Sequence, residues 1–281
     1  MSVKDLSAAR IAEGGGKARV PLLLRVYQAN WFSYVPSLVG LLLFWEFATE
    51  FLKVPAYLVP KPADVALAFG QNWQTLLTET VATLREILGG FAIALATAIP
   101  LALLIVYSRT FERFANPPII ISQAVPKVAI APLFLVWFGF GEFSKMLIAG
   151  LIAFFPMLIS AVVGLKSIDP EMLGLAKTMG SSALRTFWKV RLPCALPEFF
   201  GGFKLAITFS VIGAVIGEFV GGDHGIGYLI QMASGSQRLD LLFAGLTILS
   251  ALGLGLYMLV EALERRFCFI GDANAHINVT A

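Results

Sequence analysis

Two ionisable residues lie inside otherwise apolar stretches of this 281-residue chain, and both are candidate functional residues. Lys127 lies in an apolar stretch rich in proline, and Glu218 lies near the end of another apolar stretch. A charge in apolar surroundings is costly unless it is paired or hydrated. Asp223 and His224 are neighbours in a glycine-rich segment, where one such pair is typical of a loop hydrogen bond. No arrangement of Ser, His and Asp, of Cys and His, or of paired carboxylates indicates an enzyme.

The sequence predicts no bound cofactor, metal or nucleic acid. Residues 14–17 (Gly-Gly-Gly-Lys) superficially resemble a phosphate loop, but Ile11 and Ala18 stand where that motif needs Gly and Ser or Thr. Cys194 and Cys268 are far apart in sequence and indicate neither a disulfide framework nor a metal cluster. The net charge of +3 gives no support for nucleic-acid binding.

The composition predicts an integral membrane protein. Hydrophobic residues make up 58% of the chain and charged residues 14%, whereas a soluble domain carries about 25% charged residues. The surplus of apolar surface must face lipid. We therefore expect an all-α fold in which the backbone polar groups are satisfied within helices.

Six segments are apolar enough to cross a bilayer, which takes about 20 residues. Four prolines interrupt the third segment, so we expect that span to be bent or broken. A glycine-rich turn at residues 221–227 is expected to lead into a short helix. The six predicted spans are residues 26–45, 87–108, 114–141, 146–165, 205–220 and 241–260.

The distribution of basic residues predicts the orientation of these spans. Six spans place both termini on one side, and that side receives fifteen of the 21 Lys and Arg residues, against five on the other side. The side richer in Lys and Arg is cytoplasmic. We therefore expect a cytoplasmic N-terminal segment at residues 1–25, a membrane domain at 26–266, a cytoplasmic tail at 267–281 and an external glycine turn.

This topology leaves two alternatives for each of the two charged residues. Lys127 either lines a cavity that a polar or anionic solute crosses, or reaches the cytoplasmic interface where the helix breaks. Glu218 either lines the outer mouth of a pathway, or caps its span beside the external turn.

The longest polar interruption in the second half of the chain, residues 169–193, has an ordered pattern of its own. Asp169 and Pro170 predict the start of a short amphipathic helix. Gly180 allows the chain to leave that helix in a left-handed conformation. Ser181 or Ser182 then caps a second helix over residues 183–190, which Leu192 and Pro193 close. The pattern predicts a cytoplasmic helix–glycine–helix hairpin suited to docking a soluble partner, against the alternative that its apolar residues pack on the chain's own spans.

The hairpin resembles the cytoplasmic signature of ABC importer permeases. Gly180, nine intervening residues and then Val190 to Pro193 match the glycine-to-Ile-x-Leu-Pro half of that signature. The preceding Glu-Ala-Ala is represented only by Ala176, with Glu171 about one turn earlier. Residues 126–133, 137–139, 154–156, 165–169 and 225–229 are similar to the nitrate, sulfonate and taurine branch. The sequence of residues 125–133 resembles that of permeases in this branch that are linked to pyrimidine-precursor or riboflavin uptake.

The resemblance implies a type I ABC importer transmembrane domain in a bacterial inner membrane. Its expected partners are a second permease chain forming a homodimer, two copies of an ATPase subunit, an extracytoplasmic solute-binding protein and membrane lipid. The missing phosphate loop agrees with a partner that hydrolyses ATP. The residues expected to dock the ATPase are Glu171, Met172, Leu175, Ala176, Lys177, Met179, Gly180, Arg185, Leu192 and Pro193, and those for the pathway are Lys127 and Glu218.

The main alternative is a secondary transporter driven by an ion gradient. Such a protein ordinarily shows several intramembrane acidic residues and internal repeats, whereas only Glu218 is a candidate here. A channel would not need a docking hairpin. The sequence therefore favours a solute pathway that obtains its energy from another chain.

Overall fold

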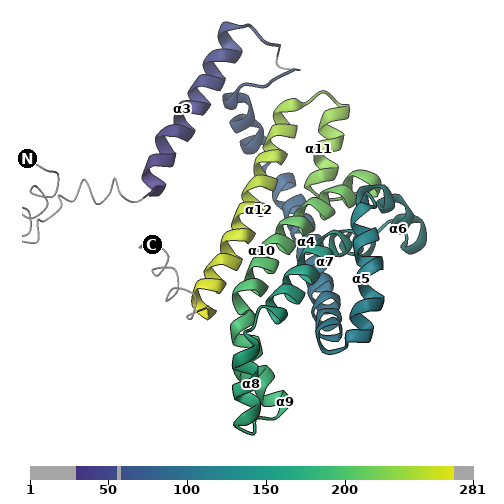
Figure 1. Cartoon of the computed structure of the whole chain (residues 1–281). Coiled ribbons are helices and arrows are strands. Elements are labelled where there is room, and N and C mark those ends of the chain that lie inside the picture. Colours follow the sequence, from purple (N-terminus) through teal and green to yellow (C-terminus); the bar gives the residue numbers. More distant parts are fainter. Residues whose placement is uncertain (1–29, 56–57, 269–281) are drawn as a thin grey trace, which may run out of the picture. The chain divides into compact units, whose positions relative to one another are not determined.

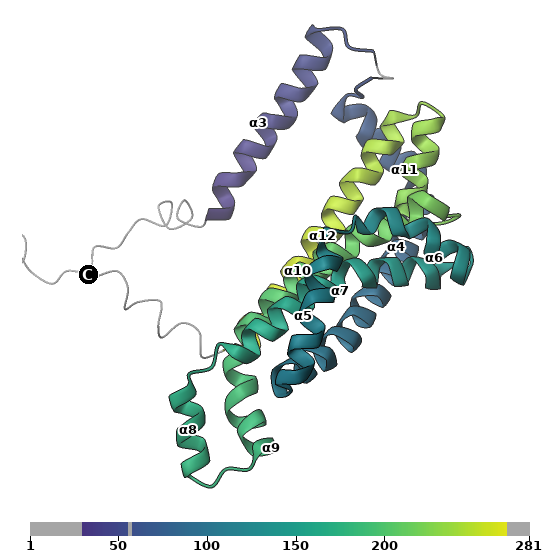
Figure 2. The ribbon, with the colours of Figure 1, turned by 45° about the vertical axis from the view of Figure 1, so that its right-hand side comes forward.

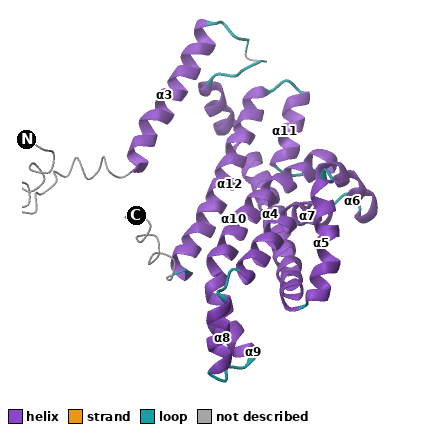
Figure 3. Cartoon of the chain, in the orientation of Figure 1, coloured by secondary structure: helices purple, strands orange, loops and turns teal. Residues whose placement is uncertain are grey.

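The computed structural model describes residues 30–55 and 58–268. The predicted N-terminal segment 1–25 and residues 269–281 of the predicted tail lie outside the described residues. The chain divides into two compact units, residues 1–54 and 55–281. Within the described part, the regular elements are all helical (Figure 3). They are α3 (Asn30–Phe51), α4 (Pro62–Tyr107), α5 (Arg109–Ala124), η1 (Lys127–Ile130), α6 (Ala131–Phe138), α7 (Glu142–Lys166), α8 (Pro170–Thr178), α9 (Ala183–Thr186), η2 (Phe187–Arg191), α10 (Leu192–Gly221), α11 (Ile226–Gly235) and α12 (Leu239–Phe267).

The first unit contributes one helix, α3, to the described structure. Its apolar middle exposes Leu41, Leu43 and Phe44, and its last turns contain Glu46 and Glu50. It covers most of the predicted first span at 26–45, whose first four residues are not described.

Four helical segments of the second unit are long and apolar enough to cross a membrane. They are Pro62–Tyr107, Glu142–Lys166, Ala183–Gly221 and Leu239–Phe267. A fifth span results if the bent pair formed by α5 and η1–α6 is taken together. The described residues therefore give four or five spans by length and apolarity, and the predicted span at 26–45 begins outside them.

The second predicted span is part of a much longer helix. α4 starts at Pro62 and includes the polar residues 72–80 before the apolar part. Asn72 has non-helical backbone angles, and its side-chain amide donates to the carbonyl of Ala68 at 2.9 Å, so the helix kinks there. The kink separates the first turns of α4 from a continuous helix of more than thirty residues.

The expectation of a broken third span is confirmed, although the break is not at every proline. Pro117 and Pro118 lie inside α5, which continues to Ala124. The chain then turns at Val125 and Pro126, and the two helical parts meet at 89°. Pro126 lacks an amide hydrogen, so the helical hydrogen-bond pattern stops at this point.

α7 lies between α4 and α10 and forms the centre of the second unit (Figures 1 and 2). Small residues allow this close contact, because a Cβ added at Gly90 would be 2.4 Å from the Cβ of Ala149. A Cβ added at Gly213 would be 2.5 Å from the Cα of the same alanine. Such small-residue contacts are typical of helix packing in membranes.

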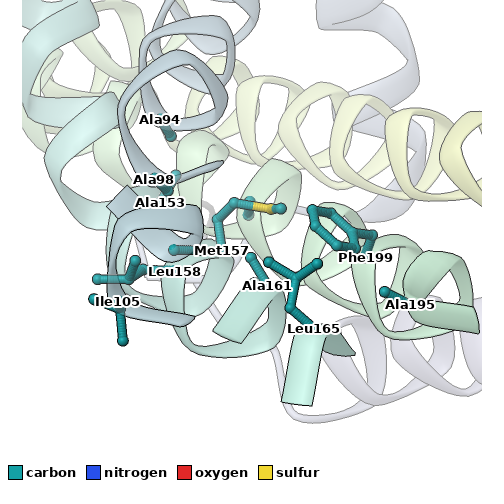
Figure 4. Close-up of a cluster of buried hydrophobic side chains, with 12 residues drawn as sticks. Ala94, Ala98, Ile105, Ala153, Met157, Leu158, Ala161, Leu165, Ala195 and Phe199 are labelled. Carbon is teal, nitrogen blue, oxygen red and sulfur yellow. The ribbon is translucent and has the colours of Figure 1, made fainter. Parts of the chain in front are cut away.

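Alanines and a few larger side chains continue this core toward the hairpin end of the unit (Figure 4). Ala94 and Ala98 of α4 face Ala153 and Met157 of α7, and Phe199 of α10 completes the cluster. All five side chains are buried. The three central helices are therefore held together along their length by contacts within one chain.

Candidate functional site

The hairpin is formed as its sequence predicts up to its second helix. The Asp169 carboxylate accepts a hydrogen bond from the Glu171 amide at 2.8 Å, and α8 starts at Pro170. Gly180 adopts φ +70°, a left-handed conformation that favours glycine. The Ser181 amide then donates to the Ala176 carbonyl at 3.1 Å, which closes the helix end.

The second helix of the hairpin does not end where the sequence predicts. Ser182 caps it by accepting from the Arg185 amide at 3.4 Å, but α9 continues through the π-helical η2 into α10. The Leu192 amide donates to the Phe187 carbonyl, five residues back. Pro193 has no amide to donate, and the wider π turn accommodates it. Leu192 and Pro193 thus start a membrane helix instead of closing the hairpin.

The hairpin exposes a set of large apolar side chains at one end of the second unit (Figure 2). Leu175 is 62% exposed and Met179 is 78% exposed, although both are apolar. Exposed apolar surface of this kind marks an interaction site. We call this set the hairpin apolar face; it consists of Met172, Leu175, Met179, Leu184 and Trp188.

The other predicted docking residues surround this face or lie at its base. Glu171 and Arg185 are exposed, and Ala176 is half-buried. Lys177 lies in α8, but its side chain is outside the described part. Leu192 and Pro193 are half-buried at the start of α10. The structure thus collects the predicted residues on one hairpin, and Leu184 and Trp188 are additions that the sequence-based prediction left out.

Lys127 lies at the 89° bend between α5 and η1. It is half-buried, and its ammonium is 4.8 Å from the centre of the Phe155 ring of α7, a cation–π distance. α5 has 16 residues between Arg109 and the bend, so at about 1.5 Å per residue Lys127 is roughly a bilayer half-thickness or more away from that end. Whether Lys127 lines the pathway or reaches the interface stays a prediction.

Glu218 is fully buried on the half of the unit away from the hairpin, together with two other charged residues. Lys145 of α7 and Glu86 of α4 are also buried, with the Lys145 ammonium 2.8 Å from Glu86 Oε1. Neither Glu86 oxygen has a donor in favourable hydrogen-bond geometry among the described residues, so this contact is an ion pair. The Glu86 and Glu218 carboxyl groups also interact with each other.

Hydrogen bonds connect this buried charge cluster to the glycine turn. Glu218 accepts from the Thr83 hydroxyl at 2.6 Å and from the Gly227 amide at 2.5 Å. Lys145 donates to the His224 carbonyl at 3.0 Å. Full ionisation would leave one net negative charge in the cluster, and the partial positive charge at the N-terminus of α11 offsets it. Glu218 thus accepts at the start of α11 rather than capping its own span, and its place at the mouth of a pathway stays a prediction.

Comparison with known proteins supplies the decisive observation for the family. The profile of the "Binding-protein-dependent transport system inner membrane component" family matches residues 90–268. The chain belongs to this family. The matched residues include the hairpin, α10 and the glycine turn.

Curated relatives are similar to this permease over most of their length. A probable ABC transporter permease of Haemophilus influenzae is 39% identical over 227 residues, covering 81% of this chain and 93% of the relative. The riboflavin transport system permease RibX of Chloroflexus aurantiacus is 40% identical over 234 residues, covering 82% of this chain and 86% of RibX. The formylaminopyrimidine transport permease ThiX of Halalkalibacterium halodurans is 33% identical, covering 85% and 95%.

The fold agrees with a solved importer. A chain of the MetNI methionine ABC transporter in an inward-facing conformation is similar with a TM-score of 0.61 at 17% identity. The match covers 70% of this permease and 98% of that chain. The permease is thus an all-α integral membrane protein with the fold of a type I ABC importer transmembrane domain, and it forms the membrane pathway of an ABC importer.

Proposed function

We propose that this permease pairs with a second copy of itself and carries a small polar or anionic organic solute inward from a solute-binding protein. An ATPase subunit docks on each hairpin and supplies ATP hydrolysis. Both termini and the hairpins face the cytoplasm, and the glycine turn faces outward. Of the candidate solutes, riboflavin-like and pyrimidine-like molecules are favoured, because RibX and ThiX are similar to this permease over most of the chain. Sulfonates such as taurine come next, because the taurine permease TauC is 30% identical to this chain.

The observation that carries the docking part of the proposal is the hairpin apolar face. Large side chains such as Leu175 and Met179 are exposed on the hairpin, where α8 is not one of the helices long and apolar enough to cross a membrane. Short amphipathic helices bind partners by placing their apolar face in a groove. A partner with such a groove would bury this face, and the φ of Gly180 keeps the two helices in the orientation that presents it.

The docking test replaces an exposed apolar side chain with a charged one. Met179→Asp is expected to weaken co-purification with the partner ATPase on the order of tenfold or more, because a carboxylate would be buried without a partner in the groove. Met179→Leu is the matched control and should bind normally. Unchanged co-purification of Met179→Asp would contradict docking through this face.

The solute is tested separately, by uptake of labelled probes into vesicles that hold the complete transporter. Radiolabelled riboflavin, a formylaminopyrimidine and taurine are the three probes. Uptake of riboflavin or of the pyrimidine, with taurine excluded, is expected. Uptake of taurine alone would assign the permease to the sulfonate group instead.

A further inference from the structure

The N-terminus of α11 is held by three side chains from two other helices, α4 and α10. The Gly225 amide donates to Glu79 Oε2 at 2.5 Å, the Ile226 amide donates to Thr83 Oγ1 at 2.8 Å, and the Gly227 amide donates to Glu218 Oε2 at 2.5 Å. The first amides of a helix have no partner within the helix, so they need acceptors from outside. A local side chain usually supplies one acceptor, whereas here three consecutive amides are satisfied by α4 and α10.

The turn before α11 is fixed on its other side by α7. The Lys145 ammonium donates to the His224 carbonyl at 3.0 Å and is itself anchored by Glu86 at 2.8 Å. Lys145 is only 1% exposed. Consequently both the amides and a carbonyl at this point of the backbone are bound by buried side chains.

Two glycines make room for this arrangement. A Cβ added at Gly225 would be 1.9 Å from Glu218 Oε1, and one added at Gly227 would be 2.5 Å from Oε2. Gly225 also has φ +113°, which disfavours other residues. The spacing Gly225-Ile226-Gly227 is therefore explained by the close approach of Glu218, and not only by the need for a tight turn.

The side chains of the turn are largely exposed, although Asp223 Oδ1 is 3.7 Å from the Lys145 ammonium and His224 Nδ1 is 3.9 Å from Glu79 Oε1. Asp223 is 72% exposed and His224 is 67% exposed, while the His224 backbone is bound as described. The turn joins α10 to α11 on the half of the unit away from the hairpin (Figure 1). A rigid backbone here presents two exposed polar side chains in a fixed geometry.

We propose that Glu79, Thr83, Lys145 and Glu218 form a clamp that joins α4, α7, α10 and α11 into one rigid block beside the 222–225 turn and holds this turn ready for the solute-binding protein. This inference rests on the proposed function for the identity of the partner. A loop that is ordered before binding loses less conformational entropy on association. The clamp residues are thus positioning residues for the delivery step, and they touch neither ATP nor the solute.

Thr83 offers the sharpest test, because its hydroxyl joins Glu218 to the Ile226 amide. In the reconstituted complex of permease, ATPase and solute-binding protein, Thr83→Val should raise the binding-protein concentration that half-stimulates ATP hydrolysis by on the order of tenfold. Hydrolysis without binding protein should stay within about twofold of the original rate, since the hairpin is unchanged.

Thr97→Val is the matched control. Thr97 is on the same helix, is exposed, and its hydroxyl bonds only within α4 in the described part, to the Ile93 and Ala94 carbonyls. It should leave the half-stimulating concentration unchanged. The proposal would be overturned if Thr83→Val and Thr97→Val needed the same binding-protein concentration to half-stimulate ATP hydrolysis. It would also be overturned if Thr83→Val lost unstimulated hydrolysis without a change in that concentration.

Amide hydrogen exchange tests the clamp without any variant and without the partner's identity. In the purified permease–ATPase complex, the amides of residues 225–227 should exchange far more slowly than in an unstructured peptide of the same sequence. Exchange as fast as in the peptide would overturn the clamp even if transport is normal. Conversely, protected amides in a complex that no binding protein stimulates would keep the clamp and refute the proposed function.

Discussion

At the scale of single residues, the charges buried in this permease are organised by pairing. The Lys145 ammonium is 2.8 Å from Glu86 and 3.7 Å from the exposed Asp223. It also interacts electrostatically with the buried Glu218, which is bound to Thr83 and Gly227. Because one ammonium serves two carboxyl groups, the loss of Lys145 should cost more than the loss of Glu86. The remaining Glu218 can still offset the ammonium when Glu86 is gone.

This asymmetry gives a stability prediction. Lys145→Met should lower the free energy of unfolding by about 3–5 kcal/mol, because it leaves carboxyl groups buried without a cation. Adding Glu86→Gln to Lys145→Met should recover part of that loss, since one of the two carboxyl groups is then removed. Thermal unfolding in detergent compares the variants. A double variant less stable than Lys145→Met would contradict the pairing described here.

At the scale of elements, two turns of the second unit each depend on a glycine with positive φ. Gly180 and Gly225 both have positive φ, but for different reasons. An added Cβ at Gly180 would have no atom within 4 Å in the described structure, so only the backbone conformation matters there. At Gly225 the same Cβ would collide with Glu218.

The hairpin turn can therefore be tested by backbone strain alone. Gly180→Val should destabilise the left-handed turn by about 1–2 kcal/mol, reorient α8 against α9 and uncouple ATP hydrolysis from uptake. Gly180→Asn should retain most of the coupling, because asparagine tolerates this conformation. The ratio of ATP hydrolysed to solute taken up is the measurement. Normal coupling in Gly180→Val would refute the role of the turn.

The sequence predicted these elements well where nearby residues determine the start or end of a helix, and less well where contacts between helices determine it. The start of α8, the left-handed Gly180 and the cap at Ser182 followed from local residue types, and the structure confirms them. The end predicted at Leu192 and Pro193 was wrong, because a π turn absorbs the proline and continues the helix.

The buried cluster shows the limit of sequence analysis. The second span was predicted to start at residue 87, which left Glu86 outside it, and Lys145 was counted as an external charge. A signal was nevertheless present, since Glu79, Thr83 and Glu86 are spaced to share one face of a helix. What they face comes from α7, α10 and α11, and no local pattern shows that these helices converge there.

At the scale of the whole molecule, the two proposed partner surfaces lie on opposite halves of the second unit (Figure 2). The hairpin is at one end, and the turn before α11 is on the half away from it. α7 and α10 run between them and pack through small residues such as Ala149 and Gly213. This arrangement suits a protein that binds one partner on each side of a membrane.

The chain's two cysteines test the proposed orientation. Cys194 is exposed beside the hairpin, and Cys268 follows α12. In intact spheroplasts neither should react with an impermeant maleimide, whereas an Asp223→Cys variant should react from outside. After permeabilisation Cys268 should react more slowly than Cys194, because burial raises the pKa of the Cys268 thiol and lowers its thiolate fraction. Labelling of Cys194 in intact spheroplasts would contradict the proposed orientation, because it would place the hairpin outside the cell.

The central claim is that this permease moves its solute only with energy delivered at the hairpin by an ATPase. Vesicles containing the permease, its ATPase and its solute-binding protein test it most directly, by measuring uptake of the labelled solute with ATP, without ATP, and with an ion gradient alone. Uptake should require both the ATPase and ATP, and Met179→Asp should abolish it while Met179→Leu does not. Gradient-driven uptake by the permease without ATP would instead establish a secondary transporter.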